Sequence, residues 1–242
     1  MFRHRHKRTH AQDLRIATLL SFVAGSVNVI GFIAVHRLTT NITGHFAFFM
    51  DDVLKLHWVE GIIYFGFVLA FLLGAFVANT LVEVVHRFNE RNIFIAPVAL
   101  EITILLAVAV SGRSMMAIMP DVLALVLLFA MGMQNSLVTR ISNAVVRTTH
   151  LTGLFTDLGI ELSQLFFYRT QEQRGKLYAN IQLRLGIIVF FFLGGVTAGL
   201  LYTLIAMHAL LVPALLLAIG LIYDRLKYSL RAWTKKDQRP SG

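Results

Sequence analysis

The chain has 242 residues, of which 57% are hydrophobic and only 14% are charged, and its mean hydropathy is +0.70. Soluble domains carry about 25% charged residues, so this composition excludes an ordinary soluble domain and a disordered chain. Cysteine is absent, which excludes disulfides, thiolate metal sites and thiol nucleophiles.

In chain order, six apolar stretches approach the roughly 20 residues that a helix needs to cross a bilayer. They are Leu14–Val35, Val59–Val82, Ile93–Val110, Met119–Val138, Gln182–Thr203 and Met207–Tyr223. Helices are expected because lipid offers no hydrogen-bond partner to a bare amide. The first stretch has no small-residue cleavage site, so we expect it to be retained rather than removed as a signal peptide.

The basic residues predict an orientation. With both ends in the cytoplasm, 19 of the 22 Lys and Arg lie on the cytoplasmic side, and only Arg37, Lys55 and Arg113 lie outside. This asymmetry is typical of bacterial inner-membrane proteins. It accounts for the net charge of +9 without nucleic acid, which we do not expect as a partner.

Two further apolar segments, His45–Leu56 and Leu154–Phe167, are too short to cross. At 1.5 Å per residue they reach only about 18–21 Å. We predict an all-α polytopic membrane protein with six transmembrane helices and two short helices that are re-entrant or lie in the interface.

The second half of the sequence repeats the first. Four landmarks recur in the same order: Thr39–Phe46 resembles Thr148–Phe155, Gly25 and Asn28 match Gly132 and Asn135, Phe71–Ala75 matches Phe191–Gly195, and Pro97 matches Pro213. We predict a basic tail at 1–13, one three-span repeat at 14–112, a second at 113–228, and a basic tail at 229–242. Because three is odd, the second repeat is inverted in the membrane, as in many transporters.

These residues resemble a known family. The glycine-rich first helix with Asn28, the Thr43-Gly44 pair, Gly132-Met133-Gln134-Asn135 and Thr152-Gly153 are similar to the YoaK family (domain of unknown function 1275). The resemblance covers roughly residues 14–225 and implies a bacterial inner-membrane protein with about six spans. This sequence has His45 where the family usually has Asn after Thr-Gly, and Asn28 where it often has an acidic residue.

The two Thr-Gly segments are candidate pathway residues. Threonine hydroxyls can donate and accept, glycine lets the backbone approach a ligand closely, and the helix N-termini that follow favour anions or carbonyl oxygens. The alternative is that these residues only cap the helices. The candidates are Thr39, Thr40, Asn41, Thr43, Gly44 and His45 in the first segment and Thr148, Thr149, His150, Thr152 and Gly153 in the second.

Glu101 is the one carboxylate well inside a predicted span. A charge at the bilayer centre costs at least about 2.5–3.5 kcal/mol, so Glu101 should face the bundle and be protonated or paired. It could carry a proton that is coupled to transport, or it could be a neutral group bonded to a neighbouring helix.

Each remaining polar residue in an apolar segment has a structural interpretation beside a functional one. Asn28 and Asn135 are expected to hydrogen-bond between helices across the two-fold axis, and contact with a ligand is the alternative. Asp157 and Glu161 share one face of a short helix. We expect this face to be the wet side of an interfacial helix, although it could gather cations.

Small residues recur at four-residue spacing in the second span, at Gly66, Ala70, Gly74 and Ala78. We expect this stripe to pack against the fifth span, which contains Gly195 and Gly199. The alternative use is a homodimer.

The histidines and acids lack convincing metal-ligand spacing, both in His45, Asp52 and His57 and in His4, His6 and His10. No nucleophile–base set or phosphate loop is visible. We therefore expect no enzyme, metal or cofactor. The leading hypothesis is a transporter or channel for an unidentified small solute. The alternative is a membrane protein that binds a lipid or a partner subunit.

Overall fold

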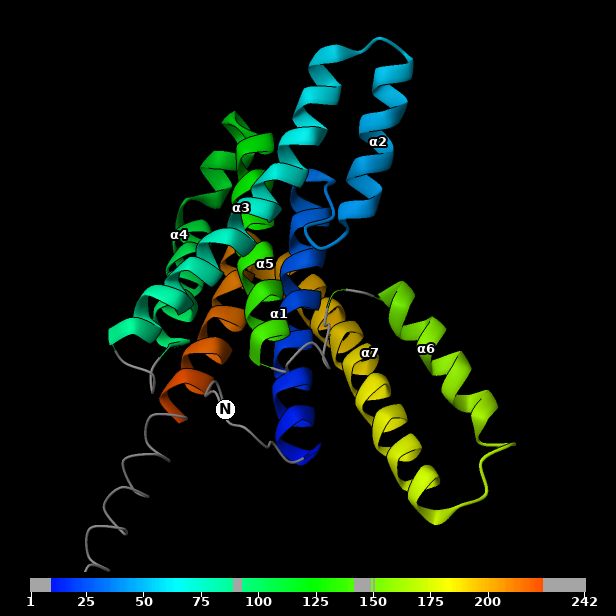
Figure 1. Cartoon of the computed structure of the whole chain (residues 1–242). Helices are drawn as coiled ribbons and strands as arrows, with labels where there is room; N and C mark the ends of the chain where they lie inside the picture. The colour runs from blue at the N-terminus through cyan, green and yellow to red at the C-terminus, as the bar shows by residue number, and fades with distance from the viewer. Residues whose placement is uncertain (1–9, 89–92, 142–148, 150, 224–242) are drawn as a thin grey trace, which may run out of the picture.

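The computed structural model describes residues 10–88, 93–141, 149 and 151–223, and every regular element in these residues is a helix (Figure 1). The elements are α1 (His10–Val35), α2 (Ile42–Leu54), α3 (Trp58–Phe88), α4 (Ile95–Ile118), α5 (Pro120–Ile141), α6 (Leu151–Gln164), α7 (Gln171–Ile205) and the 3-10 turn η1 (Ala206–Leu210), after which residues 211–223 are helical. The predicted all-α class is confirmed.

The helix ends follow from local chemistry. Asn41 caps α2 by accepting a hydrogen bond from the Gly44 amide at 3.0 Å, and the Thr170 hydroxyl caps α7. Pro120 is the first residue of α5, where its missing N–H leaves no bond unmade. His36 after α1 and Ala206 after α7 both adopt positive φ angles. A right-handed α-helix requires negative φ, so these residues end α1 and α7.

Five helices in the described residues are long and apolar enough to cross a membrane: α1, α3, α4, α5 and Gln171–Tyr223, which contains α7 and η1. The sequence predicts six spans, and the difference lies at the C-terminal end. Residues 211–223 provide only 13 described helical residues after η1, about 20 Å, which is less than the 30 Å of hydrocarbon. The sixth span therefore stays a prediction.

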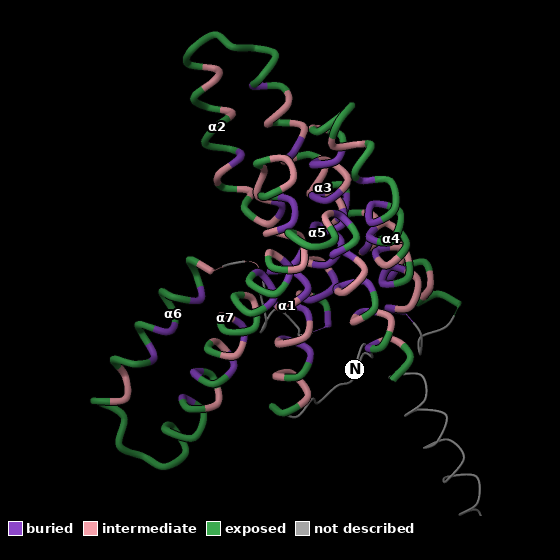
Figure 2. The backbone as a smooth tube through the Cα atoms, turned by 180° about the vertical axis from the view of Figure 1, so that it is seen from behind, coloured by how far each residue is buried: buried purple, intermediate pink, exposed green. Residues whose placement is uncertain are grey.

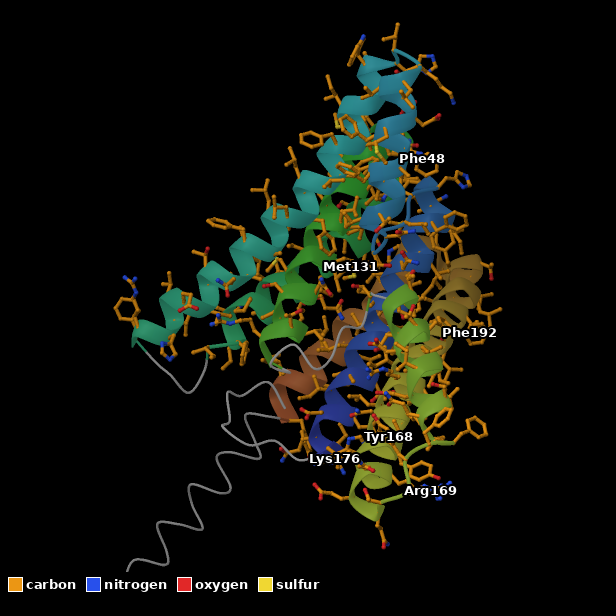
Figure 3. All side chains as sticks on the ribbon, turned by 45° about the vertical axis from the view of Figure 1, so that its right-hand side comes forward. Phe48, Met131, Tyr168, Arg169, Lys176 and Phe192 are labelled. Carbon is orange, nitrogen blue, oxygen red and sulfur yellow. The ribbon has the colours of Figure 1, made fainter. Side chains whose placement is uncertain are left out.

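The core lies where α1 and α5 meet at the centre of the bundle. Both helices are largely buried, whereas α3 and α7 keep apolar faces exposed (Figure 2). Fully buried Val27 and Leu127 contribute to this core, and Met131 lies well inside it (Figure 3). Exposed apolar side chains such as Phe192 suit a lipid-facing surface.

Glycines bring two pairs of helices into backbone contact. A Cβ at Gly25 of α1 would overlap the carbonyl oxygen of Phe191 in α7, and a Cβ at Gly194 of α7 would overlap that of Phe22 in α1. Such contacts are typical of small-residue interfaces in membranes.

The same arrangement joins α3 to α5. A Cβ at Gly74 would overlap the carbonyl oxygen of Phe129, and one at Gly132 would overlap that of Phe71. The expectation that the stripe with Gly74 packs against the fifth predicted span is therefore wrong. The stripe packs α3 on α5, and the glycines of α7 pack on α1.

Two helical hairpins, α2–α3 and α6–α7, extend toward opposite ends of the molecule (Figure 1). In the same view α1 rises while α5 descends, so these two contacting helices run in opposite directions. The two short helices expected from the sequence are confirmed as α2 and α6. Each begins a few residues earlier than predicted, at the Thr-Gly pair.

Candidate functional site

The first junction, residues 36–41, joins α1 to α2 and is tied to α1 by Asn28. The Asn28 side-chain oxygen accepts hydrogen bonds from the Thr40 amide at 3.2 Å and from the Thr40 hydroxyl at 3.0 Å. These bonds stabilise the chain that follows α1, because the Thr40 amide lies between two helices and has no helical partner.

The second junction, residues 142–150, joins α5 to α6 and repeats this bond. The Thr149 hydroxyl donates to the Asn135 side-chain oxygen at 2.9 Å. The candidates Thr148 and His150 lie outside the described residues. The expectation that Asn28 and Asn135 hydrogen-bond across the two-fold axis is wrong in the described contacts, because each oxygen accepts from the junction that follows its own helix.

Among the remaining candidates of the two Thr-Gly segments, one caps a helix and others are exposed at the surface. Asn41 caps α2, and Gly44 leaves room for this, because a Cβ there would approach the side-chain nitrogen Nδ2 of Asn41 to 3.0 Å. Thr43 is exposed, as are Thr152 and Gly153 at the start of α6. For α2, the capping alternative is therefore correct for Asn41.

A charged and aromatic cluster surrounds the first junction. The Arg37 guanidinium lies 5.0 Å from the centre of the Tyr64 ring and 5.7 Å from that of Phe67. The His45 ring packs against the same two rings at 6.0 and 5.1 Å, and its Nε2 lies 2.6 Å from the Leu38 carbonyl oxygen. Burial lowers the pKa of His45, and the Arg37 charge adds to this against the Leu38 hydrogen bond. His45 is therefore neutral at pH 7.

Glu101 lies in the second turn of α4 and is fully buried. Neither carboxyl oxygen has a hydrogen-bond partner. An ionised carboxylate without partners is not tolerated in such a place, so Glu101 is held as the neutral acid. Its predicted position inside the bundle is confirmed, and the described contacts do not join it to either junction.

Asp157 and Glu161 of α6 face α7, where Arg184 binds both. The Arg184 Nη2 lies 3.1 Å from an Asp157 oxygen and 3.2 Å from a Glu161 oxygen. Glu161 is buried, and this burial raises its pKa, an effect that the Arg184 charge offsets only in part. The expectation of a wet acidic face is therefore wrong for Glu161, because Arg184 draws it against α7.

The described residues contain no group of three or more histidines and acids close enough to hold a metal ion. Asp52 and His57 lie near each other at 3.8 Å, and His45 faces the aromatic rings instead. His4 and His6 lie outside the described residues.

Sequence reasoning missed the roles of Arg37 and Arg184. Both were counted only as charges that set orientation. For Arg184 a signal existed, because a cation inside an apolar run needs an anion, and Asp157 with Glu161 is an acidic pair spaced to supply one. No sequence signal places Arg37 on Tyr64 and Phe67, which lie 27 and 30 residues further along the chain.

Comparison with known proteins identifies a family. A family model described as "Protein of unknown function (DUF1275)" matches residues 16–223. The UPF0700 transmembrane protein YoaK of Bacillus subtilis (strain 168) is 23% identical over 186 residues, which cover 76% of this chain and 82% of that protein. No solved structure matches the chain significantly. Because the family model spans most of its residues, the chain belongs to the DUF1275 family, and its apolar helices agree with a transmembrane protein.

Proposed function

We propose that this protein is a small-solute transporter of the bacterial inner membrane, built from two inverted repeats at residues 14–112 and 113–228. In this arrangement six membrane segments leave both ends in the cytoplasm, and the two junctions line the solute path on opposite sides. Inverted repeats suit alternating access, because the same movement of either half closes one side of the membrane.

The observation that carries this proposal is the reciprocal packing of the halves. Gly25 meets Phe191, and at the corresponding repeat positions Gly132 meets Phe71. The first helix of each half is thus packed on a later helix of the other half, while α1 and α5 run in opposite directions (Figure 1). This is the packing expected of two similar units related by a two-fold axis in the membrane plane.

Matched hydrogen bonds at the junctions support the same proposal. Asn28 with Thr40 and Asn135 with Thr149 occupy equivalent positions in the two repeats. The first junction interrupts the helical path and carries polar groups beside an apolar bundle. Irregular backbone at membrane depth is tolerated where it is buried in protein or lines a water-filled path.

In this proposal Glu101 couples the movement of a proton to the movement of the solute. It is a buried acid with no protein partner, so its proton can be exchanged without breaking an ion pair. Its repeat mate is Leu217, so the proton site belongs to the first half alone. We propose that Glu101 takes up or releases a proton as the solute passes.

A flux experiment tests this function. The protein is reconstituted into vesicles containing a pH-sensitive dye, and proton movement is recorded when small organic solutes are added outside. We expect solute-dependent proton movement that Glu101→Gln abolishes, and an infrared carboxylic C=O band that the same variant removes. Glu83→Gln is the matched control, because Glu83 is half exposed and pairs with Arg140 at 2.7 Å. Flux that Glu101→Gln leaves intact, or a missing band, would exclude the proton role.

A second candidate, a protein that binds lipid without transporting, is favoured by the tip of the α6–α7 hairpin. Phe166 and Phe167 are 84% and 77% exposed there, and Tyr168, Arg169 and Lys176 lie at the same end (Figure 3). Aromatic and basic side chains together suit a membrane interface. This alternative predicts no flux in the vesicles for any solute, and weaker binding to anionic lipid when Arg169 is replaced by glutamine.

A further inference from the structure

Backbone contacts join four of the long helices into two pairs, α1 with α7 and α3 with α5. In the first pair Gly25 and Gly194 lie against main-chain atoms of the partner helix, and in the second pair Gly74 and Gly132 do the same. The main chain of a helix is held by its own hydrogen bonds and cannot repack as a side chain can. Each pair should therefore move as one stiff unit. We call α1 with α7 the first body and α3 with α5 the second body.

A polar contact reinforces each body. In the first body the Ser26 hydroxyl donates to the Gly194 carbonyl oxygen at 3.1 Å, and this bond is buried. In the second body Arg140 of α5 pairs with Glu83 of α3 at 2.7 Å. Within each body, the close backbone contact and a polar contact therefore hold the same two helices together.

The contact between the two bodies lies where α1 meets α5, and it is of a different kind. For a Cβ added to Gly31 of α1, the nearest α5 atom is the methyl carbon Cδ1 of Leu127, at 3.5 Å. A buried hydrogen bond also crosses here, from Nε2 of Gln134 in α5 to the Leu20 carbonyl oxygen at 2.7 Å. Side-chain ends can repack when helices slide, so this contact permits a small movement of one body against the other.

Arg37 links the two bodies near the first turn of α5. Its Nη2 lies 3.5 Å from a carboxylate oxygen of Asp121, and its guanidinium lies 5.0 Å from the centre of the Tyr64 ring in α3. Arg37 itself belongs to the first junction, which Asn28 of α1 holds through Thr40. The side chain therefore extends from the end of the first body to both helices of the second.

The sequence repeat relates the two bodies to each other. Gly25 of α1 corresponds to Gly132 of α5, and Phe71 of α3 corresponds to Phe191 of α7. Each body therefore takes one helix from either half. A two-fold axis that relates the halves exchanges the bodies, so a movement that opens their contact on one side of the membrane has an equivalent that opens it on the other.

We propose that the two bodies rock against each other at the contact of α1 with α5 during transport, and that Arg37 with Asp121 closes this contact on one side of the membrane. The glycine contacts inside each body stay intact while Arg37 and Asp121 separate. Both side chains are partly exposed, at 29% and 41%, so water replaces the ion pair when it opens. The inference rests on the proposed transport function, for which it names the moving parts.

Crosslinks test this movement in the reconstituted protein, which has no cysteine of its own. Arg37→Cys with Asp121→Cys places two thiols across the bodies, and Glu83→Cys with Arg140→Cys places two thiols inside the second body. Both replaced pairs are partly exposed ion pairs, so the two variants are matched. A short cleavable thiol crosslinker should abolish solute-dependent flux in the first variant, with recovery on cleavage, and should leave flux unchanged in the second.

Two results of the crosslinking would overturn the proposal. Flux that persists when Arg37→Cys is bridged to Asp121→Cys would show that the bodies need not separate there. Flux that is lost when Glu83→Cys is bridged to Arg140→Cys would show that α3 and α5 do not move as one body.

A distance measurement tests the movement without flux and without a change at Arg37. Spin labels at Val84→Cys and Val122→Cys lie within the second body, whereas labels at Val84→Cys and Leu200→Cys lie on different bodies. All three natural side chains are exposed. In lipid nanodiscs, double electron–electron resonance should give a narrow distance distribution for the first pair and a broad or two-peaked one for the second. Equal widths would overturn the proposal.

Failure of this movement and failure of the transport function give different results. A broad distribution between the bodies, with no flux for any solute, would keep the two bodies and remove transport. Flux with equally narrow distributions would keep transport and remove the rocking bodies.

Discussion

Glycine at positions 25, 74, 132 and 194 omits the side-chain atom that would separate α1 from α7 and α3 from α5. At each position an added Cβ meets a backbone carbonyl, which cannot rotate away as a side-chain end would. The helices therefore approach until their backbones touch, and dispersion along the contact stabilises the bundle without any hydrophobic drive between helices in lipid.

The close packing of α3 on α5 at Gly132 predicts how one added methyl group changes the free energy of unfolding. Gly132→Ala should lower the free energy of unfolding by about 1–3 kcal/mol, because α3 must move away from α5. The measurement is reversible unfolding in mixed detergent micelles. Gly153→Ala is the control, since nothing lies within 4 Å of a Cβ there, and it should leave stability unchanged or slightly higher. Equal losses in the two variants would contradict the close packing.

The junction bonds can be measured as a pair. In a double-mutant cycle of Asn135→Ala and Thr149→Val, we expect a coupling energy of about 1 kcal/mol, the net value of one such hydrogen bond. The same cycle at Asn28 and Thr40 should give a similar or larger value, because Asn28 also accepts from the Thr40 amide. Additive losses in both cycles would show that these bonds contribute nothing.

At this scale the sequence predicts which residues matter better than it predicts their partners. Asn28 and Asn135 stand out because a polar side chain in an apolar span must be satisfied. Their partners are missed because a short asparagine side chain reaches the nearest free groups, and helix ends leave such groups close by in Thr40 and Thr149.

Among the elements, α6 is the least firmly held. Apart from a few buried apolar residues, such as Leu158 against Leu177, its attachment to α7 depends on Arg184 with Asp157 and Glu161 (Figure 2). Most of its surface is exposed. Few buried contacts give a segment a low free energy of local opening.

The pKa of Glu161 gives this opening a pH dependence. Burial raises the pKa of Glu161 while α6 is packed on α7. When α6 opens, the pKa of Glu161 returns to its ordinary value of 4.5. At pH values just above 4.5, Glu161 is therefore protonated more often in the closed state than in the open state. The contribution of Glu161 to closure should therefore be greatest near pH 4.5 and weaken as the pH rises through the window above it. The measurement is hydrogen exchange of α6 amides, corrected for the intrinsic rate.

Two variants check the assignment to Glu161. Glu161→Gln should remove the pH dependence, whereas Glu172→Gln, in an exposed pair with Lys176, should keep it. An opening free energy of α6 that does not change with pH in the natural protein would refute this account.

The elements themselves follow from hydropathy and length, because lipid permits only helices of about 20 residues. Which helix packs on which does not. The spacing of Gly66, Ala70 and Gly74 shows that one face of α3 packs closely, but α5 and α7 both present glycines that fit it. Only the path of the whole chain decides that α3 packs on α5.

For the whole molecule, the proposed inverted repeats predict where the hairpin ends lie. Lys55 at the end of α2 and Lys176 at the start of α7 are exposed, and the chain has no cysteine of its own. Lys55→Cys in intact cells should react with a membrane-impermeant maleimide, whereas Lys176→Cys should react only after the membrane is opened. Labelling of both residues from one side would rule out the inversion.

The contact between α1 and α7 also sets an order of events during synthesis. The Ser26 hydroxyl donates to the Gly194 carbonyl oxygen at 3.1 Å, across 168 residues of chain. We therefore expect the first helix to enter the bilayer long before the ribosome has made the surface that covers Gly25. Lipid is then expected to occupy the exposed face of α1 until α7 displaces it in the last steps of assembly.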